Sequence, residues 1–115
     1  MTRDDPGLSI VWMTAPDAAT AERIVRALVD ERLIACANLL PGVTSVYRWE
    51  GAVHAEPEVL VIMKTRRDRL APLFERAAAL HPYQVPELVA APLEAGLPAY
   101  CAWMADEAAP VGEVK

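Results

Sequence analysis

Residues 35–51 read ACANLLPGVTSVYRWEG, and residues 52–65 continue as AVHAEPEVLVIMKT. Side chains two positions apart in a strand share a face, and both stretches are rich in strand-forming residues. Pro41-Gly42 is expected to form a bend or bulge inside one long strand. Glu50-Gly51 is a turn signal. The two stretches predict one long β-hairpin, with residues 52–65 as a central strand that is apolar on both faces.

On the N-terminal side of this hairpin the sequence predicts a strand and a helix. Residues 8–14 form a short apolar run that is typical of a buried strand. Apolar residues then recur at helical spacing over residues 17–31, which indicates an amphipathic helix. Asp17 is expected to cap it, because its carboxylate can accept backbone N–H bonds of the first turn.

Three more elements are predicted on the C-terminal side. A second helix follows the hairpin and ends at about residue 80, where His81-Pro82 stops it. Residues 85–93 predict a strand at a sheet edge or beside a bulge, since they contain two prolines. Residues 98–107 predict a last helix, and the tail from Ala108 is expected to fray.

The order β-α-β-β-α-β with an added terminal helix indicates an α+β fold of the ferredoxin-like, split βαβ type. We expect an antiparallel four-stranded sheet with two helices on one face. The 115 residues are expected to form a single domain, residues 1–115, with an ordered core at about 8–107. Because the strands are apolar on both sides, something must also cover the other face of the sheet.

The length of the hairpin predicts an oligomer. A straight strand over residues 52–65 spans roughly 46 Å, whereas a compact domain of this size is only roughly 34 Å across. The hairpin would therefore overhang its own subunit, and Tyr47 and Trp49 near its tip are residue types favoured in interfaces. We expect these two residues at a subunit interface. The alternative is a monomer whose hairpin bends back over its own sheet.

Composition narrows the classes of partner. The net charge of −5 argues against nucleic-acid binding, which depends on basic patches. No apolar run approaches the roughly 20 residues that a membrane span needs, so no membrane contact is expected. The polar, acidic N-terminus is unlike a secretory signal. We therefore expect a cytoplasmic protein in which Cys36 and Cys101 are free thiols.

Three groups of residues resemble the CutA family of divalent-cation tolerance proteins, in order and at the family's spacing. The most specific is residues 35–51. The second is Thr14-Ala15-Pro16-Asp17, and the third comprises Lys64-Thr65, His81 to Leu88, and Gly96 to Tyr100. The resemblance runs from about residue 8 to 107. It implies a ferredoxin-like subunit, a tight homotrimer in which long hairpins extend sheets between subunits, and a role in tolerance of copper and other divalent cations. It also implies a shape similar to that of the PII signalling proteins.

The resemblance implies a metal site that this chain retains only in part. In some bacterial members the site uses a cysteine, where this chain has Met13, and two adjacent histidines, where it has Leu80-His81. A thioether is a soft donor suited to Cu(I) and a weak one for Zn(II). We therefore expect copper or another divalent cation to bind weakly and to be no obligatory cofactor. The candidate ligands are His81, Cys36, Met13 and Glu87, and each has an ordinary structural alternative as a helix-end or core residue.

Three functions remain open from the sequence. The first is a trimeric, non-enzymatic protein linked to cation tolerance. The second is a PII-like sensor that binds an anionic metabolite at subunit clefts, although no glycine-rich phosphate loop is present. The third is an enzyme, which the sequence disfavours because it contains no activating motif around Cys36 or His81.

Overall fold

The computed structural model describes residues 7–112. The strands and helices follow one another in the order that the sequence predicts. They are β1 (Leu8–Ala15), α1 (Ala18–Asp30), β2 (Cys36–Trp49), β3 (Ala52–Arg66), the 3-10 turn η1 (Arg67–Arg69), α2 (Leu70–Leu80), β4 (Val89–Leu93) and α3 (Pro98–Glu107).

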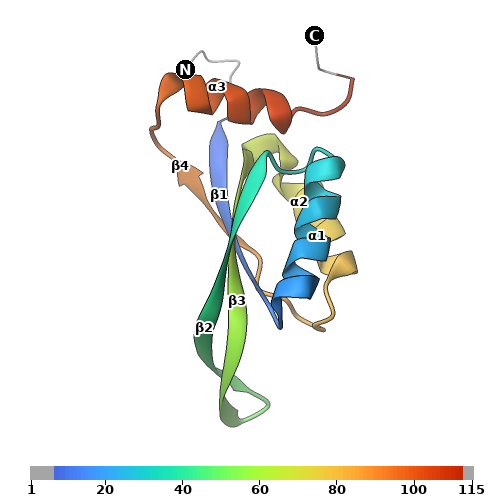
Figure 1. The fold of residues 1–115 in the computed structure, drawn as a ribbon, viewed down its shortest axis with the longest axis vertical. Coiled ribbons are helices and arrows are strands. Elements are labelled where there is room, and N and C mark those ends of the chain that lie inside the picture. The colour runs from blue at the N-terminus through green and yellow to red at the C-terminus, as the bar shows by residue number, and fades with distance from the viewer. Residues whose placement is uncertain (1–6, 113–115) are drawn as a thin grey trace.

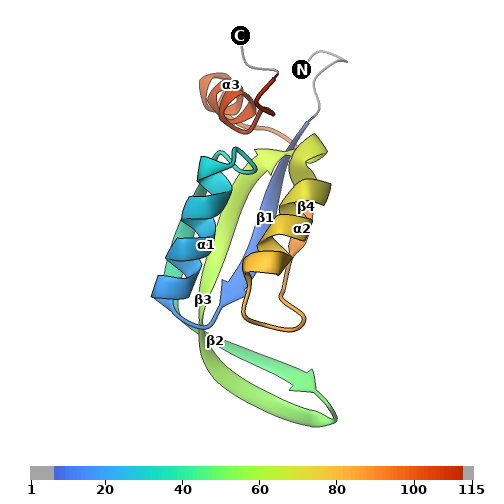
Figure 2. The ribbon, with the colours of Figure 1, turned by 90° about the vertical axis from the view of Figure 1, so that its right-hand side faces the viewer.

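The four strands form one antiparallel sheet in the order β2-β3-β1-β4. Helices α1 and α2 pack side by side on one face of this sheet, and α3 lies across the end opposite the hairpin tip (Figures 1 and 2). This arrangement confirms the ferredoxin-like α+β fold with an added C-terminal helix, and it confirms residues 52–65 as a central strand. Within residues 7–112, no helix is long and apolar enough to cross a bilayer.

The core lies between the sheet and the two helices. Val11 and Met13 of β1 and Val61 of β3 are fully buried there, against apolar residues of α1 and α2. The alternate positions, such as Trp12 and Ile62, pair with each other on the opposite face and are only partly buried. Among the elements described, no helix covers that second face (Figure 1). The prediction that both faces of the sheet carry apolar side chains is therefore confirmed.

Local signals fix most of the element boundaries. Asp17 caps α1, since its carboxylate accepts the Thr20 N–H at 2.7 Å. Helix α2 ends at Leu80, directly before His81-Pro82. The predicted strand over 85–93 is too long, because only Val89–Leu93 pairs with β1, at the sheet edge. The preceding residues instead form one wall of a cleft.

The hairpin is continuous but bent. Its register shifts between Leu40 and Val43, which places the predicted bulge at Pro41-Gly42, and Gly42 has a φ of 82°. Beyond the bulge the two strands remain paired as far as Trp49 and Ala52. The subunit is 48 Å long but only 25 and 23 Å across, because the hairpin projects beyond the helices (Figure 1).

The expected fraying from Ala108 is wrong for the residues that directly follow α3. Ala108 and Ala109 are buried. Arg32, in the turn after α1, donates from Nε to the Ala109 carbonyl at 3.0 Å and from Nη2 to the Asp106 carbonyl at 2.7 Å. The sequence gives no local sign of this bond, because 74 positions separate Arg32 from Asp106.

Candidate functional site

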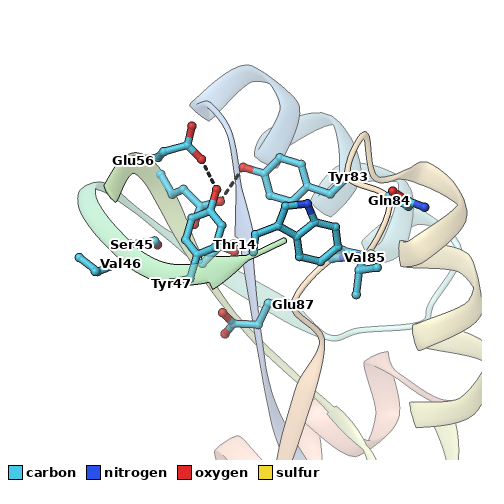
Figure 3. A pocket seen from close by; sticks show the side chains of 12 residues that line it. Thr14, Ser45, Val46, Tyr47, Glu56, Tyr83, Gln84, Val85 and Glu87 are labelled. Atoms are coloured by element: carbon cyan, nitrogen blue, oxygen red, sulfur yellow. Dashed lines mark hydrogen bonds between the residues drawn. The ribbon is translucent and has the colours of Figure 1, made fainter. Parts of the chain in front are cut away.

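A cleft of about 670 Å³ lies between the outer half of the hairpin and the segment that joins α2 to β4. Figure 3 shows Tyr47 of the hairpin and Tyr83 of the joining segment around this space, and the Glu87 side chain extending toward the hairpin. The lining residues are Thr14, Ser45, Val46, Tyr47, Trp49, Glu56, Glu58, Tyr83, Gln84, Val85, Pro86 and Glu87.

The pairing register explains why the hairpin turns polar side chains into the cleft. Directly opposed residues of an antiparallel pair point to the same side of the sheet. Beyond the bulge Ser45 pairs with Glu56 and Tyr47 pairs with His54, so these residues share a face with Glu58. The bend at the bulge lets this face meet residues 83–87 rather than solvent.

His81 holds the opposite wall in place. Its Nδ1 accepts the Tyr83 N–H at 3.1 Å, and its Nε2 lies 2.7 Å from the carbonyl oxygen of Thr14. The tautomer that satisfies both bonds carries its hydrogen on Nε2 and donates it to Thr14. The ring is buried and also contacts the Tyr83 ring, at a centroid distance of 4.6 Å. His81 therefore fastens the start of the 83–87 segment to the end of β1.

Two tyrosine–glutamate pairs cross the cleft wall. The Tyr83 hydroxyl donates to a carboxylate oxygen of Glu58 at 2.5 Å, and the Tyr47 hydroxyl donates to Glu56 (Figure 3). Burial, followed by the hydrogen bond to Glu58, raises the pKa of Tyr83 above its ordinary value. The hydrogen bond to Glu56 raises the pKa of Tyr47 as its largest cause. Both phenols are thus held in the protonated, donating form.

The cleft is strongly acidic for its size. Glu56, Glu58 and Glu87 line it, and the lining contains no lysine or arginine. Glu58 is only 9% exposed, and the one hydrogen-bond partner of its carboxylate among residues 7–112 is the neutral Tyr83 hydroxyl. Buried carboxylates are normally paired with a cation. The Glu58 carboxylate therefore has no cationic partner among the described residues of the same subunit.

The four predicted metal ligands do not come together. Met13 is fully buried on the helix-facing side of β1. Cys36 lies at the other end of the sheet, where its sulfur is 3.3 Å from the Tyr100 hydroxyl. Through Lys64 of β3, Cys36 is aligned with Ile10 of β1. Ile10 is four residues, or about 13 Å, along β1 from Thr14, the residue that His81 contacts.

The other two predicted ligands lie near each other. Glu87 lines the cleft, and His81 supports its wall with both ring nitrogens already bonded. No group of three or more His, Cys, Asp or Glu residues in the described chain is arranged to hold a metal ion.

Sequence reasoning missed the residues that give the cleft its chemistry. The residues predicted from the sequence do not include Glu56, Glu58 or Tyr83, and Tyr47 is predicted only as a subunit contact. The one available signal was the alternation of residues 52–65, which puts both glutamates on the face of Leu60. The contact with Tyr83 was not visible, because it depends on how the 83–87 segment folds back.

Comparisons with known proteins agree over almost the whole folded chain. The sequence profile of the CutA1 divalent ion tolerance protein family matches residues 9–107. The divalent-cation tolerance protein CutA of Thermus thermophilus is 46% identical over 95 residues, which cover 83% of this chain and 92% of that protein. Eukaryotic relatives are longer, and this chain spans 52% to 66% of their length.

Solved structures give the same result. The crystal structure of CutA from Xylella fastidiosa superposes with a TM-score of 0.87 at 39% identity, over 90% of this chain and 99% of that one. The structure described as the periplasmic divalent cation tolerance protein CutA from Archaeoglobus fulgidus gives a TM-score of 0.86 at 33% identity, over 89% and 99% of the two chains.

Proposed function

Since the chain belongs to the CutA1 divalent ion tolerance protein family, we propose that it acts as a homotrimer in divalent-cation tolerance and contacts copper or another divalent cation weakly. Membership in this family implies no catalytic activity. The family match, which runs from β1 to the end of α3, carries the proposal. Its test is growth in copper of cells that lack the gene. Sensitivity that the wild-type gene reverses supports the proposal, and unchanged growth contradicts it.

The shape of the subunit supports the trimer. The projecting hairpin exposes large apolar side chains, with Val46 68% and Trp49 41% accessible, and none of the helices in residues 7–112 covers the second sheet face. Exposed apolar surface of this kind marks an interaction site. Tyr47 and Trp49 remain the proposed subunit contacts.

Light scattering of the purified protein tests the assembly. We expect three times the subunit mass of 12.5 kDa. Val46→Glu is expected to shift the protein toward smaller species, because a charge would be buried at the interface. Val111→Glu, which alters an exposed valine after α3, is the matched control and is expected to remain trimeric. A single-subunit mass for the wild type contradicts the proposal.

The arrangement of donors supports weak rather than tight metal binding. The proposed ligands do not form one preorganised set within a subunit, since Met13 is in the core and His81 uses both ring nitrogens. Of the two predicted soft donors, Cys36 is the more available, because it is a free and only partly buried thiol whereas Met13 lies in the core. Calorimetric titration with Cu(I) and Zn(II) should give at most weak heats, which Cys36→Ala reduces and Cys101→Ala preserves. Equal heats in both variants would remove Cys36 as a ligand.

A PII-like sensor is the second candidate, and the cleft is the observation that favours it. Its volume is in the range of small-molecule sites. However, an anionic metabolite fits the cleft poorly, because three carboxylates line it and no basic side chain does. A thermal-shift screen against anionic metabolites is expected to show no stabilisation. A clear shift with any of them would favour the sensor.

A cytoplasmic location is part of the proposal. The relative from Archaeoglobus fulgidus is described as periplasmic, so the compartment of this chain needs its own test. Cell fractionation with antibody detection is the direct measurement, and recovery outside the cytoplasmic fraction contradicts this part.

A further inference from the structure

The carboxylate of Glu58 is the starting point, because its environment calls for a positive charge that residues 7–112 do not supply. The side chain is nine-tenths buried, and one oxygen accepts the Tyr83 hydroxyl. An ionised carboxylate offers about four acceptor positions, so this one neutral bond leaves most of them unused. A buried charge without a partner is costly unless a cation binds beside it.

The side chains around Glu58 show which kind of cation would fit beside it. Tyr47, Trp49 and Tyr83 contribute aromatic rings, and Val46, Val85 and Pro86 contribute apolar surface. Val46, Tyr47 and Trp49 are also among the proposed subunit contacts, so the cleft borders that interface in the trimer. Aromatic faces attract ammonium groups, and apolar walls bury carbon atoms. Glu87, whose side chain has no hydrogen bond or ion pair with any residue of the described range, adds a second carboxylate on the opposite wall.

We propose that this cleft binds a small organic cation, a protonated amine with an apolar body, whose N–H groups donate to Glu58. The ammonium group lies against the Glu58 carboxylate and the aromatic rings, and the carbon skeleton occupies the apolar part of the cleft. Binding leaves the Tyr83–Glu58 hydrogen bond intact, because the amine uses free acceptor positions. This site is separate from the copper contact proposed at Cys36, so either can fail without the other.

The geometry favours an amine over the other sources of positive charge. A bare divalent metal ion prefers several converging oxygen ligands, and no three acidic or other ligating side chains in the described chain converge. The space of about 670 Å³ is far larger than a metal ion and is typical of a small-molecule site. A lysine or arginine of a second subunit is the remaining source, and the experiment distinguishes it.

Titration of the assembled wild-type protein with benzylammonium chloride, followed by backbone amide NMR at constant ionic strength, tests the proposal. Saturable shifts are expected at Tyr83, Gln84 and Val85. Benzyl alcohol, the neutral analogue, is expected to produce no saturable shift there. Glu58→Gln keeps an acceptor for the Tyr83 hydroxyl but removes the charge, and it should weaken binding by about tenfold or more. Glu75→Gln, an exposed change on α2, is the control with unchanged binding.

Three outcomes of the titration would overturn the proposal: benzylammonium produces no saturable shift, benzyl alcohol or magnesium chloride binds equally well, or Glu58→Gln binds benzylammonium as the wild type does. The proposal is also overturned if a crystal structure of the assembly shows a basic side chain of a second copy on Glu58. Should Glu58→Gln fold poorly, Glu87→Gln repeats the test, because the Glu87 side chain is exposed and bonds to none of the residues 7–112.

Discussion

The Nε2 atom of His81 lies 2.7 Å from the carbonyl oxygen of Thr14, and this bond ties the segment after α2 to the C-terminal end of strand β1. The same ring accepts the Tyr83 N–H on its other nitrogen. One imidazole thus fixes the backbone on which Tyr83 reaches Glu58. The residue that sequence comparison suggests as a metal ligand has a complete structural role within its own subunit.

Replacing His81 by alanine should therefore reduce stability even without metal. The change leaves the Thr14 carbonyl and the Tyr83 N–H without partners in a buried place, which typically costs about 1–3 kcal/mol for each group. We expect a loss of unfolding free energy of roughly 2–4 kcal/mol in chelator-treated protein. Urea denaturation measures it.

His54→Ala is the matched control for that experiment. His54 lies on the exposed part of the hairpin and only stacks on Tyr47, at a centroid distance of 5.4 Å. Its loss should change stability by less than about 0.5 kcal/mol. If His81→Ala were as stable as His54→Ala in the absence of metal, the structural role of His81 would be refuted.

The tyrosines predict how stability depends on alkaline pH. The pKa values of Tyr47, Tyr83 and Tyr100 are all raised in the folded protein, mainly by hydrogen bonds to Glu56 and Cys36 and, for Tyr83, by burial. A raised folded-state pKa contributes stability below the ordinary value of about 10, and this stability is lost as the pH rises through the folded-state pKa. Denaturation midpoints should therefore begin to fall near pH 10.

Ultraviolet titration of tyrosinate checks the same prediction directly. The unfolded protein should ionise near pH 10, whereas the folded protein should ionise later. Glu58→Gln removes the negative charge beside Tyr83 and should lower the pKa of that tyrosine toward its ordinary value. Superimposable titration curves for folded and unfolded protein would contradict the raised values.

The sequence predicted the fold better than the site for a physical reason. Alternation in residues 52–65, the cap at Asp17 and the breaks at Pro41-Gly42 and His81-Pro82 act over a few positions, so they could be recognised in the sequence. The pairs Tyr83–Glu58 and Arg32–Asp106 join residues 25 and 74 positions apart. Such contacts depend on how loops fold back over the sheet, and the alternation of residues alone does not specify that.

Replacing Arg32 should have two opposing effects on stability, because its side chain forms hydrogen bonds while its backbone is strained. Its φ of 59° is strained for a residue with a side chain, yet its guanidinium holds the carbonyls of Asp106 and Ala109. Arg32→Ala keeps the strain and loses both bonds, so it should cost about 1–2 kcal/mol. Arg32→Gly also loses the bonds but relieves roughly 1 kcal/mol of strain.

Hydrogen exchange of the α3 amides separates these two contributions. Both variants should expose α3 to faster exchange, because each loses the guanidinium that holds its end. Overall stability in urea should nevertheless fall more for alanine than for glycine. Equal protection of α3 in wild type and both variants would show that Arg32 does not hold this helix.

Gly42 makes the bulge possible, and its backbone predicts what happens when it is replaced. Its φ is 82°, a conformation in which an L-residue is strained, and a Cβ built there would meet nothing within 4 Å. Gly42→Ala should therefore cost about 1–2 kcal/mol through backbone conformation alone. Gly112→Ala is the control, because Gly112 also has open space around it but lacks the positive φ.

Since the bulge turns the outer hairpin toward residues 83–87, Gly42→Ala should also increase amide exchange at Tyr83. Equal stability of the two alanine variants would mean that the bulge does not depend on the left-handed glycine.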